Sequence, residues 1–343
     1  MPVKIKRVLA VALAVFLILP VLSGCKNEEK ADSKPVENTP EVKEEPPEEA
    51  AVLKVLTLGH SLTVDACHML NLVAAAEGYD MLVGTLYFSG CSLSKHVDLL
   101  QKDEAAYDLY LSSTEAPGVP PAITKGVTMK YALNYEYWDV IVMQGATFEL
   151  TESATYTNGD IQTIKDYVNK HKVNPRAVFA WHMPWAIPVD PDLLATQATG
   201  TYTGKYTKFD HDRSKYFAAM AGCVRDHITT DKDFKILIPT GTAFENVLSS
   251  YMVEKDLHRD YGHATDISRL ITAYTYFCCL TGVTELKEIK LNEVPVAFFH
   301  TTKSPLPWKL SDHEKELILE SVNNTLKTPL QMTQSKFTEK PTQ

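Results

Sequence analysis

The chain has 343 residues, 45% of them hydrophobic, with 43 acidic and 34 basic residues and a formal net charge of −9 at pH 7. This acidic balance excludes the basic surface that nucleic acids and anionic bilayers attract, so we expect neither as a binding partner. The length suffices for one hydrophobic core of ordinary size. The six cysteines show no CxxC or Cys/His metal spacing, and we expect no metal ion and no cofactor.

Residues 1–24 are typical of a secretory signal peptide. Three basic residues, Lys4, Lys6 and Arg7, precede an uninterrupted apolar run at 8–22. This run is shorter than the roughly 20 residues that span a bilayer, but it suits the apolar region of a signal peptide. We therefore expect an exported protein whose mature part lies outside the cytoplasm.

The apolar run ends in Leu-Ser-Gly-Cys, which resembles the lipobox of bacterial lipoproteins. The resemblance implies that the thiol of Cys25 is diacylated and that Cys25 becomes the new N-terminus. Two acyl chains give stable membrane anchoring, whereas a single chain is marginal. The alternative is an ordinary signal peptide with a cysteine just beyond its cleavage site.

A tether at 25–50 follows the signal peptide. After Cys25 it contains nine acids, four lysines, four prolines and no aromatic residue, so it cannot bury enough apolar surface to fold. One globular domain is expected at 51–330. The polar segment 331–343 is expected to be disordered.

The domain alternates short apolar strands with helices. Fully apolar strands separated by helices indicate a parallel sheet covered on both faces. We predict a three-layer α/β sandwich with a doubly wound, flavodoxin-like parallel sheet of about five strands. The last helix opens at Ser311 with Glu314 three residues later, a capping box. The polar stretches 105–132 and 185–212 are expected to form pocket loops. Strands are expected at 52–59, 81–89, 139–143, 176–183 and 234–239, and the other helices at 64–77, 93–105, 159–171, 211–229 and 266–281.

Polar or aromatic residues follow each of the first four expected strands. They occupy 59–63, 89–92, 144–147 and 181–185. Ligands of open parallel sheets bind beyond the carboxyl ends of the strands. We therefore expect these four segments to converge at one edge of the sheet.

Four segments of the chain, from about residue 52 to residue 282, resemble the sequence blocks of SGNH (GDSL-type) hydrolases. Gly-His-Ser-Leu at 59–62 lies where that superfamily has its nucleophile, Gly90 lies at its second block, 144–147 at its third, and Asp260 and His263 match its Asp-x-x-His block. The chain looks most like a little-characterised branch of exported proteins with Gly-Asn-Ser at the nucleophile. The resemblance implies an esterase with Ser61 as the nucleophile.

The chemistry of ester cleavage explains these residue types. A serine hydroxyl is a weak nucleophile and needs an imidazole base, here His263, oriented by a third group, here Asp260. The oxyanion needs preorganised donors: the backbone N–H groups of Ser61 and Gly90 and a side chain from the third block, either Gln144 or Thr147. In the alternative, Ser61 merely caps the helix that follows it, and His263 is a structural histidine.

Two departures from the superfamily pattern concern the same blocks. Position 60 is His where Asp is usual, and the third block lacks the usual asparagine. His60, Trp181, His182 and Trp185 are expected to line the substrate pocket, where the tryptophans could stack on a sugar ring. Equally, the two tryptophans could pack under a loop.

These observations favour a cell-surface serine esterase that removes a small acyl group, an O-acetyl group in our hypothesis, from a carbohydrate. The reaction class rests on the four blocks, whereas the substrate rests on analogy and on export. The alternative is a non-catalytic glycan-binding lipoprotein that keeps the fold. A metal site at His60, His182, His263 and Asp260 is a third interpretation, although no short-spaced ligand motif supports it. If the exported chain forms a disulfide, Cys67–Cys91 is the first pair to examine.

Overall fold

The computed structural model describes residues 52–196, 207–298 and 307–341. In this part of the chain the central sheet has seven strands in the order β4-β3-β2-β1-β5-β6-β7. Five of them are parallel, in the order β2-β1-β5-β6-β7, which confirms the predicted doubly wound α/β sheet. The parallel strands are β1 (Leu53–Gly59), β2 (Met81–Tyr87), β5 (Val140–Met143), β6 (Val178–His182) and β7 (Phe234–Ile238).

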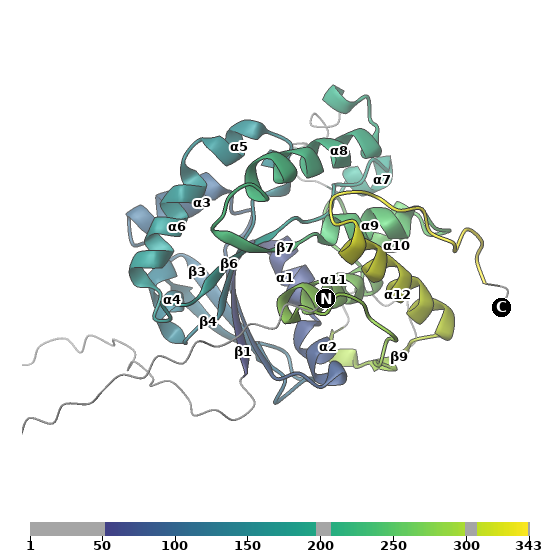
Figure 1. Cartoon of the computed structure of the whole chain (residues 1–343), viewed down its shortest axis with the longest axis horizontal. Helices are drawn as coiled ribbons and strands as arrows, with labels where there is room; N and C mark the ends of the chain where they lie inside the picture. The colour runs from purple at the N-terminus through teal and green to yellow at the C-terminus, as the bar shows by residue number, and fades with distance from the viewer. Residues whose placement is uncertain (1–51, 197–206, 299–306, 342–343) are drawn as a thin grey trace, which may run out of the picture. The chain divides into compact units, whose positions relative to one another are not determined.

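Helices cover both faces of the sheet (Figure 1), so the middle strands are apolar on both sides. One apolar core lies under α1, α2, α9, α11 and α12, and the other under α3, α4, α6 and α8. The longer helices are α1 (Ser61–Cys67), α2 (Leu70–Glu77), α3 (Leu93–Gln101), α4 (Met129–Tyr135), α6 (Asp160–His171), α8 (Arg213–Cys223), α9 (Thr240–Leu248), α11 (Asp266–Thr281) and α12 (Asp312–Lys327). Shorter elements are α5 (Ser153–Thr157), α7 (Pro191–Leu194), α10 (Glu254–Leu257), η1 (Thr147–Glu149), η3 (Thr207–Phe209), η4 (Val224–Ile228), η5 (Val296–Phe298), β8 (Glu293–Val294) and β9 (Trp308–Lys309).

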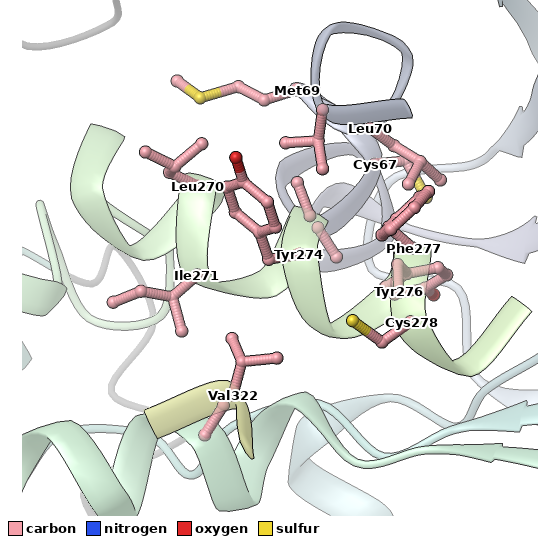
Figure 2. Packing of buried hydrophobic residues seen from close by; sticks show 14 of the residues in the cluster. Cys67, Met69, Leu70, Leu270, Ile271, Tyr274, Tyr276, Phe277, Cys278 and Val322 are labelled. Carbon is pink, nitrogen blue, oxygen red and sulfur yellow. The ribbon is translucent and has the colours of Figure 1, made fainter. Parts of the chain in front are cut away.

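Helix α11 is the centre of the first core. It occupies the predicted span 266–281 and buries side chains on nearly every side. Figure 2 shows Phe277 of α11 reaching toward Leu70 of α2, with Val322 of α12 below. A helix that is apolar all round must be enclosed, and α11 is enclosed by α1 and α2 on one side and by α9 and α12 on the other. The predicted capping box of α12 is present at Ser311 and Glu314.

The stretch 105–132, predicted to be a loop, instead contains an antiparallel hairpin that widens the sheet beyond β2. Its strands are β3 (Tyr107–Ser113) and β4 (Ala122–Val127). The sequence signal is weak because only Tyr107 and Leu109 of β3 are buried and nearly all of β4 is exposed. An antiparallel edge with one solvated face lacks the continuous apolar run that marks the parallel strands.

Three further expectations on helices and loops need correction. The helix expected at 64–77 is two helices, α1 and α2, which are separated at His68 and Met69. The stretch 185–212 contains the short helix α7, while 197–206 lie outside the described residues. The helix expected at 211–229 ends in the π-helical turn η4.

The segment 331–341 is folded back onto the domain, contrary to the disorder expected from its polar composition. Thr333 N–H donates to Asn246 Oδ1 (2.7 Å), Ser335 N–H donates to Ser249 Oγ (2.8 Å), and Tyr251 N–H donates to the Phe337 carbonyl (2.9 Å). Asn246 of α9 and two residues just after this helix therefore supply partners that the composition of the tail does not reveal.

The expected signal peptide (1–24), Cys25 and most of the tether lie outside the described residues. Within the described ranges, none of the helices combines the length and apolar character needed to cross a bilayer. Cys67 and Cys91 are both buried free thiols, so the pair suggested by the sequence is not bridged here.

Candidate active site

The four polar segments lie at one edge of the sheet, as the strand pattern predicted. Leu58, Met143 and Trp181 are aligned neighbours on β1, β5 and β6, and Gly59 pairs with Tyr87 at the end of β2. Each polar segment starts within three residues of this row. The carboxyl ends of the parallel strands therefore bring the four segments together.

Ser61 is the first residue of α1, and its side chain is half-buried. The residue that caps this helix is His60, whose Nδ1 accepts from Leu62 N–H at 3.4 Å, so Ser61 is not needed as the cap. Thr63 Oγ1 in turn accepts from His60 N–H at 3.2 Å. Among the described residues, the Ser61 hydroxyl has no hydrogen-bond partner.

His60 also connects the nucleophile helix to the third block. Because its Nδ1 accepts, its Nε2 carries the proton and faces the Gly145 carbonyl at 3.5 Å. Burial, opposed by this contact and reinforced by nearby His263, lowers the pKa of His60 to about 4. At neutral pH this second imidazole is therefore uncharged, and it caps α1.

Asp260 and His263 form a hydrogen-bonded pair on the loop before α11. His263 Nδ1 lies 2.9 and 2.8 Å from the two carboxylate oxygens of Asp260. Asp260 Oδ1 also accepts from the backbone N–H groups of Gly262 and His263. Burial opposes ionisation of Asp260, but these hydrogen bonds outweigh it and hold its pKa well below the usual value. An ionised Asp260 fixes the proton on Nδ1, so Nε2 of His263 is free to act as a base.

Gln144 and Thr147 both carry buried polar atoms without partners in the described part of the chain, Nε2 of Gln144 and Oγ1 of Thr147. Gln144 follows β5, and its Oε1 is hydrogen-bonded to His182 Nδ1. Its Nε2 is directed at the end of β1, because a Cβ on Gly59 would lie 3.2 Å from it and would also collide with Thr63. Both candidates for the oxyanion donor therefore keep an unpartnered polar atom in the described structure.

Gly90 and Glu149 shape the second and third blocks. Gly90 has a φ of +60°, a left-handed conformation that favours glycine, in the turn between β2 and α3. Glu149 Oε1 accepts from Ala146 N–H at 2.8 Å and from Leu93 N–H at 3.1 Å. This carboxylate therefore ties the third block to the start of α3. We did not anticipate Glu149 from the sequence, although its place three residues after Ala146 matches a capping position.

Trp181, His182 and Trp185 are fully buried, so the expectation that they line the substrate pocket is wrong. Trp185 stacks on Phe244 with ring centroids 4.5 Å apart, and its Nε1 donates to the Gly262 carbonyl at 2.8 Å. It thus supports the loop that carries Asp260 and His263. Trp181 packs against other aromatic side chains in the second core.

His182 has both ring nitrogens occupied, Nδ1 by Gln144 and Nε2 by Thr240 Oγ1 at 2.7 Å. Burial lowers the pKa of His182 far below its usual value, so the ring is neutral. It orients Gln144 and offers no lone pair to a metal ion. The described ranges contain no group of three or more His, Cys, Asp or Glu side chains arranged to hold a metal ion.

A buried carboxylate, Asp65, connects the nucleophile helix to the Asp260–His263 loop. It lies one turn after Ser61 on α1 and is 1% exposed. Arg269 Nε of α11 donates to it at 2.9 Å, Arg259 Nη1 at 3.0 Å, and Ala264 N–H at 2.9 Å. Burial opposes its charge, but the two guanidinium groups outweigh burial and lower its pKa. The sequence feature that could have indicated this role is an acidic residue within an otherwise apolar helical segment.

Comparisons with known proteins place this chain within a family. The family model "Domain of unknown function (DUF4886)" matches residues 54–295. The crystal structure of a DUF4886 family protein from Bacteroides uniformis ATCC 8492 is similar, with a TM-score of 0.67 and 23% identity over 83% of this chain and 98% of that chain. That likeness concerns the fold.

Two more distant structures are also similar. One is a candidate SGNH hydrolase from Slackia heliotrinireducens, with a TM-score of 0.40 and 16% identity over 67% of this chain and 100% of that chain. The other is a carbohydrate esterase family 2 enzyme with a carbohydrate-binding domain from Corynascus thermopiles (Myceliophthora fergusii), with a TM-score of 0.36 and 15% identity over 69% of this chain and 68% of that chain. No curated protein matches the chain.

Proposed function

We propose that this chain, which belongs to the DUF4886 family, is a serine esterase in which Ser61, His263 and Asp260 act together. The description of the family states no activity, so the proposal is drawn from the site. The observation that carries the proposal is the Asp260–His263 pair, with both carboxylate oxygens within 2.9 Å of Nδ1. Gln144 Nε2, which is buried, unpartnered and directed at Gly59 two residues before Ser61, supports it, because an oxyanion would supply the missing acceptor.

In the proposed reaction, Ser61 Oγ attacks the acyl carbonyl carbon while His263 Nε2 takes the hydroxyl proton. The oxyanion accepts from the backbone N–H groups of Ser61 and Gly90 and from Gln144 or Thr147. The C–O bond of the ester then breaks, and the leaving alcohol takes the proton from His263. Water repeats these steps on the acyl-serine, which releases the acid and restores Ser61.

The proposed substrate is a small acyl ester, an O-acetyl group on a carbohydrate. The expectation of export supports this choice, because acylated glycans are esters that occur outside the cytoplasm. We also propose that residues 1–24 are removed and that a lipid on Cys25 anchors the protein to the bacterial cell membrane, facing outward. The motivation is the lipobox at the end of the apolar run.

Hydrolysis of 4-nitrophenyl acetate by the full-length protein tests the proposal. Wild type should release nitrophenol, whereas Ser61→Ala and His263→Ala should each lose nearly all turnover. The double variant should be scarcely worse than either, because the two residues act as a unit. A chelator should leave the wild-type rate unchanged. Full turnover by His263→Ala would show that the Asp-x-x-His match is structural.

The second candidate is a non-catalytic glycan-binding protein. It is favoured by the absence of a hydrogen bond to Ser61 Oγ among the described residues. Catalytic hydrogen bonds are often long before substrate binds, so this observation does not exclude catalysis. Saccharide binding without turnover of any ester, in wild type and Ser61→Ala alike, would support this candidate instead.

A further inference from the structure

Three half-buried tyrosines lie beside the candidate active site, and we call Tyr87, Tyr110 and Tyr261 the tyrosine shelf. Tyr87 ends β2 opposite Gly59, two residues before Ser61 on the neighbouring strand. The rings of Tyr87 and Tyr110 are 5.5 Å apart and inclined by 30°. These two rings are therefore nearly parallel and partly open to solvent.

The shelf reaches the catalytic pair at its other end. Tyr261 lies between Asp260 and His263 in sequence, and its ring centroid is 5.6 Å from that of His263. Burial raises the pKa of Tyr261, and the charges of Asp260 and Tyr87 raise it further. Tyr261 therefore lies against the proposed base, while Tyr87 lies on β2, the neighbour of β1, and Tyr110 on β3, the neighbour of β2.

A solvent-open pocket continues from the shelf between α1 and β3. Its walls include Val64 and Cys67 of α1 and Tyr110 and Ser112 of β3. Val64 is three residues after Ser61 and so lies on the same helix face, about 4.5 Å further along the axis. The pocket therefore opens one helical turn from the proposed nucleophile.

Asn71, which also lines this pocket, indicates the polarity of its ligand. Its side chain is 1% exposed, and its Nδ2 donates to the Ser113 carbonyl at 3.2 Å. Because that contact requires a donor, the amide orientation is determined and Oδ1 is the free end. Oδ1 has no hydrogen-bond partner among the described residues. A hydroxyl could donate to it, whereas an acyl chain could not.

We propose that the tyrosine shelf binds the sugar part of the substrate, with a ring face stacked on Tyr87 and Tyr110 and one hydroxyl reaching into this pocket to donate to Asn71 Oδ1. Aromatic faces beside a buried acceptor suit a carbohydrate, which is apolar on its ring faces and rich in hydroxyl groups. The inference rests on the proposed esterase function. In this proposal Tyr87 and Tyr110, and not the buried Trp181 and Trp185, stack on the sugar ring.

The test compares two substrate types on the full-length protein. The ratio of kcat/KM for O-acetylated xylo-, cello- and chito-oligosaccharides to kcat/KM for 4-nitrophenyl acetate is measured for wild type, Tyr110→Ala and Asn71→Ala. For the preferred oligosaccharide, we expect each variant to lower this ratio about tenfold, mainly through a higher KM. Tyr131→Ala is the matched control, because Tyr131 is a half-buried tyrosine on α4, beside the second core. It should leave the ratio unchanged.

The outcomes separate this inference from the proposed function. If 4-nitrophenyl acetate is cleaved in a Ser61-dependent way but no sugar ester is preferred, or the variants leave the ratio unchanged, the inference is overturned and the esterase stands. If no ester is cleaved, the esterase proposal is overturned. Calorimetric titration with the deacetylated oligosaccharides then decides the subsite: binding that Tyr110→Ala abolishes supports it, and no binding overturns it.

Discussion

The side-chain amide of Gln144 is hydrogen-bonded through its oxygen and unpartnered at its nitrogen. His182 engages Oε1, while Nε2 is buried without a partner in the described structure. Leaving a buried donor unsatisfied costs about 1–3 kcal/mol, so such a group is expected where a ligand or transition state supplies the acceptor. Thr147 offers a second unsatisfied hydroxyl in the same block.

Substitution separates the two candidates for the oxyanion donor. If Gln144 is the donor, Gln144→Ala should lower kcat on 4-nitrophenyl acetate by roughly 10²–10³ with little change in KM, because the contact strengthens only in the transition state. Thr147→Val, which removes only the hydroxyl, should then be mild. The reverse pattern would make Thr147 the donor, and two mild variants would leave only the backbone N–H groups.

The connection between α1 and α11 is the main feature at the scale of elements. Asp65 receives donors from α11 and from the loop that carries Asp260 and His263. One carboxylate thereby sets the position of the nucleophile helix relative to the base. Trp185 supports the same loop from the other side, through the Gly262 carbonyl. The pair Asp260–His263 is thus placed by two elements distant in sequence.

Asp65→Asn tests this connection. Removing one partner of a buried ion pair leaves guanidinium groups uncompensated, so the free energy of unfolding should fall by about 3–5 kcal/mol. Urea denaturation followed by circular dichroism measures it. The control is Asp98→Asn, because Asp98 pairs with Lys95 and Lys102 on the surface of α3, where ion pairs contribute little. Equal, small effects of both substitutions would show that the Asp65 network does not hold α1 and the loop together.

At the scale of the whole molecule, several histidines are buried as neutral rings around the site. Burial is the main cause in each case: it lowers the pKa of His60 to about 4 and that of His96 to about 3, and that of His182 falls well below its usual value. Between pH 6.5 and 4 the unfolded chain therefore binds protons that the folded chain does not.

The free energy of unfolding should accordingly decrease as pH falls from 6.5 toward 4. Each such histidine contributes up to about 1.4 kcal/mol per pH unit. Urea denaturation at pH 7.5, 6 and 5 measures the slope. The low pKa values of Asp65 and Asp260 remove stability only below about pH 3.8, outside this window. His96→Phe should keep a ring beside Tyr107 and reduce the slope; a stability that is flat from pH 7.5 to 5 would contradict the neutral burial.

Anchoring is also a property of the whole molecule, and it depends on Cys25. Cys25→Ser should leave the precursor uncleaved or release the protein from the membrane fraction, because the diacylated thiol is gone. Fractionation and mass spectrometry of the N-terminus check this. An unmodified Cys25 thiol on the wild-type protein would show that the lipobox resemblance is misleading.

Local sequence patterns were enough to predict the five parallel strands, α6, α11 and the capping box of α12, because each depends on apolar periodicity or on contacts within a few residues. The pairing of Asp260 with His263 was expected from the resemblance to an Asp-x-x-His block, and only two residues lie between the partners. Ligand binding at the carboxyl edge follows from any doubly wound sheet.

Only the tertiary structure could decide which polar groups are buried and what they contact. The burial of Trp181 and Trp185, the orientation of Gln144 by His182 and the Asp65 connection join residues tens to hundreds of positions apart. The β3–β4 hairpin and the folded segment 331–341 escaped prediction because exposed strands and polar tails carry little apolar pattern. β3 pairs with β2, and the tail bonds to residues 246–251, so both depend on contacts between distant segments that composition does not reveal.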